Sequence, residues 1–205
     1  MDNYNEAAFN RKAAQYEHKW ANYLTHTHGF LLDKIETSPE DRILDVSSGT
    51  GLLARKMIDK NLPFKKLVLN DPSPKMQKFA RERVGDHPHI SFSKDTAEKL
   101  GFEESHFDTI ICLNAFHFYT EQETVLNQFK RLLKTGGTLY MLDWNRSGYF
   151  RIVNRIIKWF TAENITTCSL VEIRNMLKAC SFHIPDFKSW NWRYWKFFYI
   201  KAENS

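Results

Sequence analysis

The stretch Ile43-Leu-Asp-Val-Ser-Ser-Gly-Thr-Gly51 decides the fold of this 205-residue chain. It begins as a short apolar run, turns into a glycine-rich loop, and is followed by apolar residues at helical spacing over 52–57. Glycine is needed where a backbone turns tightly or approaches a ligand closely, because a Cβ atom would intrude. At the end of a parallel strand and beside a helix N-terminus, such a loop is typical of a nucleotide-type binding site.

The same alternation of apolar runs and helical patterns continues after the loop. Four further strands are predicted at Leu67–Leu69, Ile90–Phe92, Phe107–Leu113 and Thr138–Leu142. Helices are predicted at Ser73–Val84 and over 125–133, and we expect Gly136-Gly137 to close the second one. Short apolar strands that alternate with helices indicate a parallel sheet covered on both faces.

The C-terminal part follows a different pattern. Ser169-Leu-Val-Glu172 is a capping box, which predicts a helix to about Ala179. The strand-like segments Phe182–Ser189 and Tyr194–Ala202 follow with only a turn between them. Adjacent strands joined in this way should pair antiparallel.

The N-terminal stretch predicts a helix. Apolar side chains recur at helical spacing at Ala13, Tyr16, Trp20, Tyr23 and Leu24. We expect Gly29 to interrupt this helix before it adds another turn or two. The first twenty residues lack the apolar region of a signal peptide, and the three cysteines form no CxxC pair. These features predict a cytoplasmic protein without a disulfide framework or a zinc site.

Composition and charge narrow the classes further. With 42% hydrophobic and 26% charged residues, the chain is typical of a globular protein rather than a disordered one. Its longest uncharged stretch, Thr109–Thr120, is short of the roughly 20 apolar residues that cross a membrane. The net charge of +5 lies in residues 147–205, which carry 9 basic and 4 acidic residues. Such a region suits nucleic acid, an anionic membrane surface or an acidic substrate, or is simply a solvated face.

Two cofactors compete for the glycine loop. Asp71 follows the second strand, twenty residues after Gly51, where a carboxylate could accept hydrogen bonds from both ribose hydroxyls. The pattern Gly49-x-Gly51-x-x-Ala54 also fits the dinucleotide fingerprint and by itself would suit NAD. Asp45 argues against NAD, because a carboxylate just before the glycines would repel a pyrophosphate but could hold an ammonium group. The chain also lacks the Tyr-x-x-x-Lys pair of many dehydrogenases.

The loop motif resembles the first motif of class I S-adenosylmethionine-dependent methyltransferases, in which Asp/Glu-x-Gly-x-Gly-x-Gly is usual. Four later segments resemble further motifs of that family in the right order and spacing: Leu67–Met76, Asp95–Phe102, Phe107–His117 and Leu132–Gly137. The resemblance covers about residues 40–145. Among subgroups, the chain is most similar to small-molecule methyltransferases related to quinone-biosynthesis enzymes.

Together with the strand pattern, the resemblance implies a single α/β domain over residues 1–205. Its sheet should be Rossmann-like, seven-stranded and mostly parallel, with an antiparallel last strand and helices on both faces. Residues 1–38 would form a helical cap and 40–145 the cofactor-binding core. Residues 146–205 would supply substrate-side helices and a C-terminal β-hairpin.

Carried over residue by residue, the resemblance implies a site for S-adenosylmethionine and its product S-adenosylhomocysteine. Around the methionine part of the cofactor it implies Asp45, Ser47, Gly49, Gly51 and Asn114. Around the ribose and the adenine it implies Asp71, Met76, Asp95 and Thr96. Ser47 departs from the family, which usually has its first glycine here. Its side chain could narrow the loop or weaken cofactor binding.

Two residues are candidates for the chemical step. The sulfonium of S-adenosylmethionine is already a strong electrophile, so the protein must mainly position the acceptor and exclude water. His117 follows the fourth strand, where the acceptor should sit, and is the candidate general base. The alternative, that its ring only shapes the pocket, is favoured because no carboxylate is evident beside it. Tyr16 could close over the methyl donor or simply pack against its neighbours.

The sequence therefore predicts an enzyme that transfers the methyl group of S-adenosylmethionine to a small molecule by in-line displacement. An RNA- or protein-directed methyltransferase that uses the basic C-terminal third is the first alternative. A non-catalytic cofactor-binding module, suggested by Ser47, is the second. We expect no nucleic-acid partner, and the sequence gives no oligomeric state.

Three other features of the sequence allow more than one interpretation. The aromatic and basic helix Tyr149–Phe160 could be a lid, a peripheral contact with a membrane, or a cover for the sheet. The tail Trp190–Tyr199 interleaves aromatic and basic residues as single-strand binders do, but an edge hairpin is favoured. The pairs His26-Thr-His28 and His87-Pro-His89 lack further ligands at suitable spacing, so we expect no metal.

Overall fold

The computed structural model describes the backbone of residues 3–160 and 164–205, and the side chains of residues 17–157 and 164–205. The helices are α1 (Asn3–Leu32), α2 (Leu52–Asp59), α3 (Pro74–Val84), the short 3-10 helix η1 (Phe116–Phe118), α4 (Gln122–Leu132), α5 (Phe150–Phe160) and α6 (Leu170–Ala179). The strands are β1 (Arg42–Val46), β2 (Lys66–Asn70), β3 (Ile90–Ser93), β4 (Phe107–Leu113), β5 (Leu133–Trp144), β6 (Phe182–Trp192) and β7 (Trp195–Asn204).

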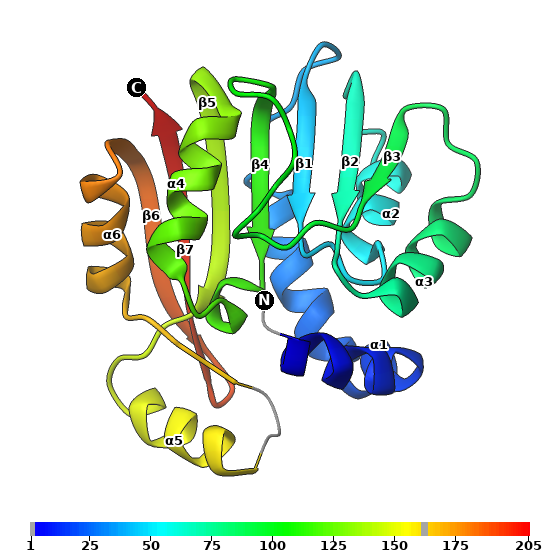
Figure 1. Cartoon of the computed structure of the whole chain (residues 1–205). Helices are drawn as coiled ribbons and strands as arrows, with labels where there is room; N and C mark the ends of the chain where they lie inside the picture. The colour runs from blue at the N-terminus through cyan, green and yellow to red at the C-terminus, as the bar shows by residue number, and fades with distance from the viewer. Residues whose placement is uncertain (1–2, 161–163) are drawn as a thin grey trace.

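The strands form one seven-stranded sheet in the order β3-β2-β1-β4-β5-β7-β6 (Figure 1). Strands β1 to β5 pair in parallel, whereas β7 pairs antiparallel with both β5 and β6. The predicted Rossmann-like sheet with an antiparallel last strand is confirmed. The predicted C-terminal hairpin is confirmed as β6 and β7.

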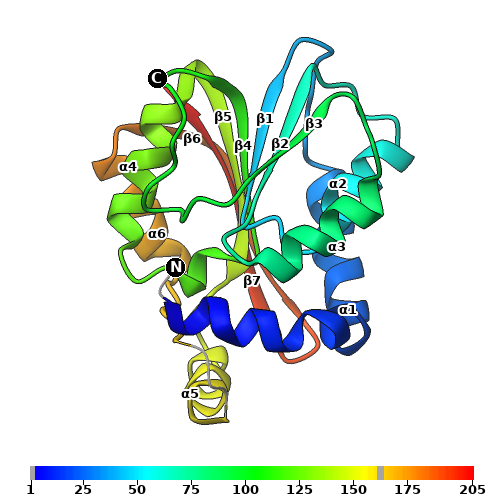
Figure 2. The same cartoon turned by 45° about the vertical axis from the view of Figure 1, so that its right-hand side comes forward.

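Helices cover both faces of the sheet, and the core lies in two layers. On one face α4 and α6 pack against inward-pointing strand residues such as Leu44 and Ile110. On the other face α1, α2 and α3 pack against residues such as Ile43 and Ile111. Neighbouring residues of one strand face opposite layers because side chains alternate along a strand. Figure 2 shows the two layers on either side of the sheet.

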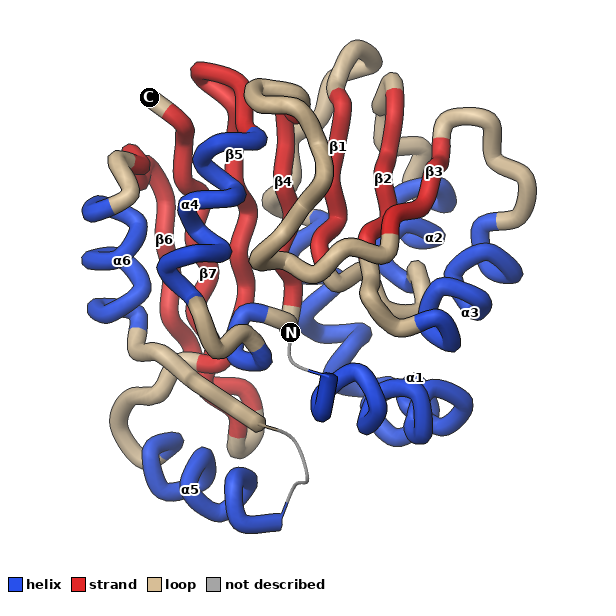
Figure 3. The backbone as a smooth tube through the Cα atoms, viewed as in Figure 1, coloured by secondary structure: helices blue, strands red, loops and turns tan. Residues whose placement is uncertain are grey.

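The carboxyl ends of the parallel strands meet at one edge of the sheet, which the first part of α1 and the protruding helix α5 flank (Figures 1 and 2). The segments that leave β1, β2 and β4 at this edge are 47–51, 71–73 and 114–118. Figure 3 shows these connections on the same side of the sheet, the first two as loops and the third with the short helix η1. Ligands of open α/β sheets bind at this edge.

Two expectations about local structure were wrong. Helix α1 continues through Gly29, because burial of Leu31 and Leu32 just after it outweighs the roughly 1 kcal/mol that a glycine costs in a helix. Strand β5 begins directly after α4 and includes Gly136-Gly137, which were expected to close that helix. A register shift between Phe107 and Thr109 of β4 accommodates the extra residues.

Candidate active site

The glycine-rich loop after β1 is held in left-handed backbone conformations. The φ angles of Ser47, Gly49 and Gly51 are +57°, +56° and +71°. A Cβ atom at Gly51 would also lie 3.0 Å from the Cβ of Ala80 in α3. Gly51 therefore serves both the turn and the close packing of α3 against the loop.

Ser47 occupies a conformation that glycine adopts more easily than any other residue. Its Oγ lies 2.8 Å from the hydroxyl oxygen of Tyr119, which is fully buried. This contact gives a physical reason why a serine is accepted where the family usually has glycine. No local pattern around Ser47 pointed to Tyr119 as its partner.

Asp71 connects the loop to the end of β2. Its Oδ2 accepts a hydrogen bond from the Gly49 backbone N–H at 2.9 Å, and its Oδ1 accepts one from the Ser73 N–H at 2.9 Å. The side chain is buried and also lines the pocket described next. Asp71 thus holds the glycine loop in place in addition to facing the ligand site.

A pocket opens at this edge between the glycine loop, the ends of β2 and β4, and helix α1. Its lining residues are Leu24, His28, Ser47, Ser48, Gly49, Thr50, Leu52, Asp71, Met76, Leu113, Asn114, Ala115 and Phe118. Five of the nine predicted cofactor-binding residues are among them. The side chains of Leu24 and His28 show that α1 forms one wall, a contribution that the sequence pattern did not reveal.

The other four predicted cofactor residues lie outside this lining. Asp45 is buried in β1, and burial together with the nearby Asp71 carboxylate raises the pKa of Asp45 from 3.8 to about 8. Gly51 packs against Ala80 of α3 and is not part of the pocket lining. Asp95 accepts hydrogen bonds from the Ser93 hydroxyl and the Gly101 N–H, and Thr96 follows it. Their roles toward a cofactor stay predictions.

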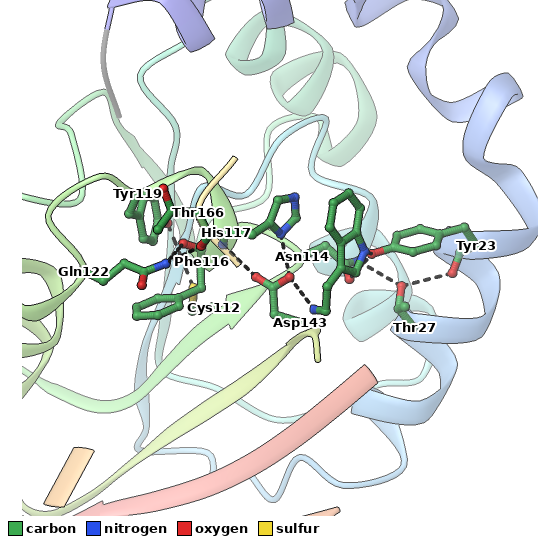
Figure 4. Close-up of polar contacts among 11 residues, drawn as sticks. Tyr23, Thr27, Cys112, Asn114, Phe116, His117, Tyr119, Gln122, Asp143 and Thr166 are labelled. Atoms are coloured by element: carbon green, nitrogen blue, oxygen red, sulfur yellow. Dashed lines mark hydrogen bonds and ion pairs between the residues drawn. The ribbon is translucent and has the colours of Figure 1, made fainter. Parts of the chain in front are cut away.

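Asn114 is anchored by side chains of α1. Its Oδ1 accepts a hydrogen bond from the Tyr23 hydroxyl at 2.8 Å, and its Nδ2 donates to the Thr27 hydroxyl at 2.9 Å (Figure 4). The Tyr23 oxygen also accepts from the indole N–H of Trp144 at 2.8 Å. This buried network fixes α1 to the ends of β4 and β5.

His117 has a carboxylate partner. Its Nδ1 lies 2.5 Å from Oδ1 of Asp143, and its backbone N–H donates to Oδ2 of the same residue at 3.1 Å (Figure 4). The expectation that no carboxylate stands beside His117 was therefore wrong. A polar Asp143 in the apolar run of β5, at the same edge as His117, was the signal that could have revealed it.

The other ring nitrogen of His117 is free. Because an ionised Asp143 only accepts hydrogen bonds, Nδ1 carries the proton and Nε2 keeps a lone pair. Nε2 is buried and has no hydrogen-bond partner among the residues that the structure describes. The ring stacks on Trp144 at 4.0 Å and contacts Phe118, which lines the pocket. Phe118 therefore contacts both the His117 ring and the pocket.

Tyr16 lies in α1, but its side chain is outside the described residues. Its proposed role over the methyl donor stays a prediction. Within the described part of the chain, no three metal-ligating side chains gather into a group, at the two His-x-His pairs or elsewhere.

Sequence matches relate part of the chain to a known family. The profile of a family described as a methyltransferase domain matches residues 44–141, which include the glycine loop, β2, β4 and most of β5. A ubiquinone/menaquinone biosynthesis C-methyltransferase from Ectopseudomonas mendocina is 33% identical over 122 residues, which are 58% of this chain and 48% of that protein. Over residues 44–141 the chain is therefore similar to the class I S-adenosylmethionine-dependent methyltransferases.

The chain spans about half the length of the curated methyltransferases it matches. Solved methyltransferase structures share its whole fold. One is the complex between the Haloferax volcanii Trm112 methyltransferase activator and a putative methyltransferase, with a TM-score of 0.85 at 18% identity over 98% of this chain and 97% of that chain. The N-methyltransferase NodS from Bradyrhizobium japonicum, solved with S-adenosylhomocysteine, has a TM-score of 0.80 at 14% identity over 98% and 99%. The expected cofactor, S-adenosylmethionine, is the one that this family uses.

The structure also places the C-terminal features of the chain. The aromatic residues of the tail include Trp195, Phe197 and Tyr199, which are buried in the core, so the favoured hairpin interpretation is confirmed. Helix α5 buries Phe150 but leaves Ile152 and Ile156 exposed. Among the described residues, no helix combines the length and apolar character needed to cross a bilayer.

Proposed function

We propose that this chain transfers the methyl group of S-adenosylmethionine to a small-molecule acceptor by in-line displacement. The family similarity supports the cofactor, and the pocket supports its position. The cofactor supplies a sulfonium whose methyl group is transferred to the acceptor.

The residues present fit this cofactor. The glycine loop leaves open space at Gly49, where an added Cβ would meet no atom within 4 Å. Asp71 and Met76 line the pocket, and the resemblance implies that they hold the ribose and the adenine. Asn114, which Tyr23 and Thr27 orient, also lines it, and the resemblance implies that it lies beside the methionine part. Asp45 lies directly before the loop as a buried carboxyl group, and an ammonium nearby would favour its ionised form.

His117 is the proposed general base. The observation that carries this role is the contact of its Nδ1 with Asp143, which fixes the tautomer and leaves Nε2 able to accept a proton. A base of this kind contributes about 10²–10⁴ in rate when the acceptor must lose a proton. Because Nε2 is buried and His117 is outside the pocket lining, the acceptor would reach Nε2 after a side-chain movement. Hydrogen bonds of this sort are often incomplete in a ligand-free enzyme.

A small acceptor is favoured over a macromolecule. Helix α1 walls one side of the pocket through Leu24 and His28, which suits a small acceptor better than a folded RNA or protein. The aromatic tail that resembled a single-strand binder is largely buried. The apolar side chains of Leu24, Leu113 and Phe118 in the pocket lining suit an apolar or aromatic molecule.

A peripheral membrane contact by α5 is a second candidate role, which exposed apolar side chains favour. Ile152 and Ile156 are 68% and 52% exposed and lie beside Arg151 and Arg155. Between Asp143 and Glu163 the sequence carries no acidic residue. Apolar side chains flanked by arginines are typical of a helix that lies on an anionic membrane surface.

The proposed reaction is tested in two steps. The protein should gain thermal stability with S-adenosylhomocysteine and none with NAD, and ligand at 100 times its dissociation constant adds about 2.7 kcal/mol. A shift with NAD alone would contradict the cofactor assignment. Turnover is then measured across a panel of small apolar acceptors, RNA and protein. Methylation of only RNA or protein would favour the first alternative, and tight cofactor binding without any turnover would favour a non-catalytic module.

His117 is tested by two substitutions in the same assay. If it is the base, His117→Ala and His117→Phe both keep S-adenosylhomocysteine affinity and lose turnover by two or more powers of ten. Equal turnover of the parent and His117→Phe would show that the ring only shapes the pocket.

A further inference from the structure

His28 is a buried side chain of α1 whose Nδ1 has no hydrogen-bond partner in the described part of the chain. It is 6% exposed, and its Nδ1 is sealed from solvent without a hydrogen bond to any described residue. Buried polar atoms are nearly always hydrogen-bonded, so an exception calls for a missing partner. His28 lines the cofactor pocket together with Thr50 and Leu52, so the missing partner can be a ligand.

The nearby His26 shows that a histidine of α1 does not in general lack a hydrogen-bond partner. Two residues apart on a helix, side chains point about 200° away from each other. His26 turns toward the C-terminal hairpin, where its ring stacks on Trp192 at 4.5 Å and its Nε2 accepts from the Trp190 indole at 3.0 Å. The His26-x-His28 pair is therefore one structural histidine and one that faces the pocket.

The surroundings of His28 keep its ring neutral. Burial, followed by the charges of Lys56 and Arg83, lowers the pKa of His28 to about 3. The ring is therefore neutral at physiological pH and carries one N–H that can donate. Arg83 donates to the Thr50 carbonyl and hydroxyl oxygens and is paired with the Glu17 carboxylate, so its charge is largely compensated. The N–H of the neutral ring can donate to a carboxylate but not to an ammonium or sulfonium group.

We propose that His28 binds the carboxylate of the methionine part of the cofactor through a ring N–H. This inference rests on the proposed function, because it needs S-adenosylmethionine in the pocket. The cofactor carries a carboxylate at one end only, so the contact would set the direction in which its amino-acid part lies along the loop. His28 would act as a binding residue and take no part in proton transfer to the acceptor.

The experiment compares two ligands that differ by this carboxylate alone. S-adenosylhomocysteine and its decarboxylated form, S-adenosyl-3-thiopropylamine, are titrated calorimetrically into the parent and into His28→Ala. Loss of a charge-assisted hydrogen bond should weaken S-adenosylhomocysteine binding by about 10- to 100-fold in His28→Ala. Binding of the decarboxylated ligand should change less than threefold (about 0.6 kcal/mol).

Two further variants serve as controls. His26→Ala removes a histidine from the same helix but from its other side, so it should leave both affinities unchanged. His28→Gln keeps an N–H donor and should restore part of the affinity for S-adenosylhomocysteine. If His28→Ala does not fold, the comparison of the two ligands in His28→Gln and the parent still measures the contribution of the carboxylate.

The outcomes separate this inference from the proposed function. Equal losses for both ligands in His28→Ala, or no loss for either, would overturn the carboxylate contact while leaving the cofactor site intact. Absence of binding by both ligands to the parent would overturn the proposed function and this inference with it.

Discussion

The hydroxyl groups of Ser47 and Tyr119 lie 2.8 Å apart beneath the glycine loop, although 72 residues separate them in the chain. Ser47 has a φ of +57°, a conformation that costs a side-chain-bearing residue roughly 1–2 kcal/mol. A hydrogen bond to buried Tyr119 contributes about 0.5–1.5 kcal/mol in return. The two effects nearly cancel.

This balance predicts an unusual order of stability at position 47. Ser47→Gly relieves the backbone and loses the hydrogen bond, so its free energy of unfolding should stay within about 1 kcal/mol of the parent. Ser47→Ala keeps the strained φ and loses the bond, so it should be less stable by about 1–2 kcal/mol. Urea denaturation of the three proteins checks this. An alanine variant more stable than the glycine variant would contradict it.

Asp71 should contribute to stability as well as to cofactor binding. Asp71→Ala leaves the Gly49 and Ser73 N–H groups without their acceptor, so it should lower the free energy of unfolding by about 2 kcal/mol without ligand. Asp71→Asn keeps one acceptor oxygen and should lose less. Both should bind S-adenosylhomocysteine at least about tenfold more weakly. A folded Asp71→Ala with full affinity would place the ribose elsewhere.

Asp143 should act on catalysis through His117. Asp143→Asn can present an N–H to His117 Nδ1, which favours the tautomer that cannot accept a proton at Nε2. We expect turnover to fall by about 100-fold or more, with S-adenosylhomocysteine affinity unchanged. Asp108→Asn, which changes a carboxylate at the opposite edge of the sheet, is the matched control. Equal effects of the two variants on turnover would argue against a base at His117.

The raised pKa of Asp45 predicts that the free energy of unfolding depends on pH. Unfolded, its carboxyl group ionises near 3.8, whereas in the folded protein burial and Asp71 raise its pKa to about 8. Between these pH values unfolding releases a proton, so the free energy of unfolding falls as pH rises. Relative to Asp45→Asn, the parent should lose stability from pH 5 to pH 8 and then level off. Parallel curves for the two proteins in guanidinium denaturation would show that Asp45 is ionised in the fold.

Helix α5 predicts weak binding to anionic membranes. Vesicles of phosphatidylcholine with phosphatidylglycerol should sediment the protein, and pure phosphatidylcholine vesicles should not, because each basic residue near an anionic surface contributes about 1 kcal/mol. Ile152→Ser with Ile156→Ser should reduce this binding. Val171→Ser, which changes an equally exposed apolar residue of α6, should leave it unchanged. Equal sedimentation of both variants would exclude α5 as the contact.

Local patterns in the sequence determined most of the fold. The bounds of β4 were predicted to the residue, and the capping box at Ser169 begins α6 as expected. The glycine loop, Asp71 and Asn114 were placed at one edge because the ends of parallel strands must meet there. Burial on both faces gives such strands a continuous apolar run, and a helix N-terminus is set by side chains within one turn. These signals lie within a few residues of one another.

Only the tertiary structure decided which side chains meet across that edge. Asp143 reaches His117 because β5 lies beside β4, with Leu142 in register with Leu113. His28 enters the pocket because α1 packs over the loop. Neither contact leaves a local pattern, since a hydrogen bond between residues far apart in the chain depends on strand order and helix placement. The sequence by itself determined the strands, the loop and the cofactor class, whereas packing decided the partner of His117 and the wall of the pocket.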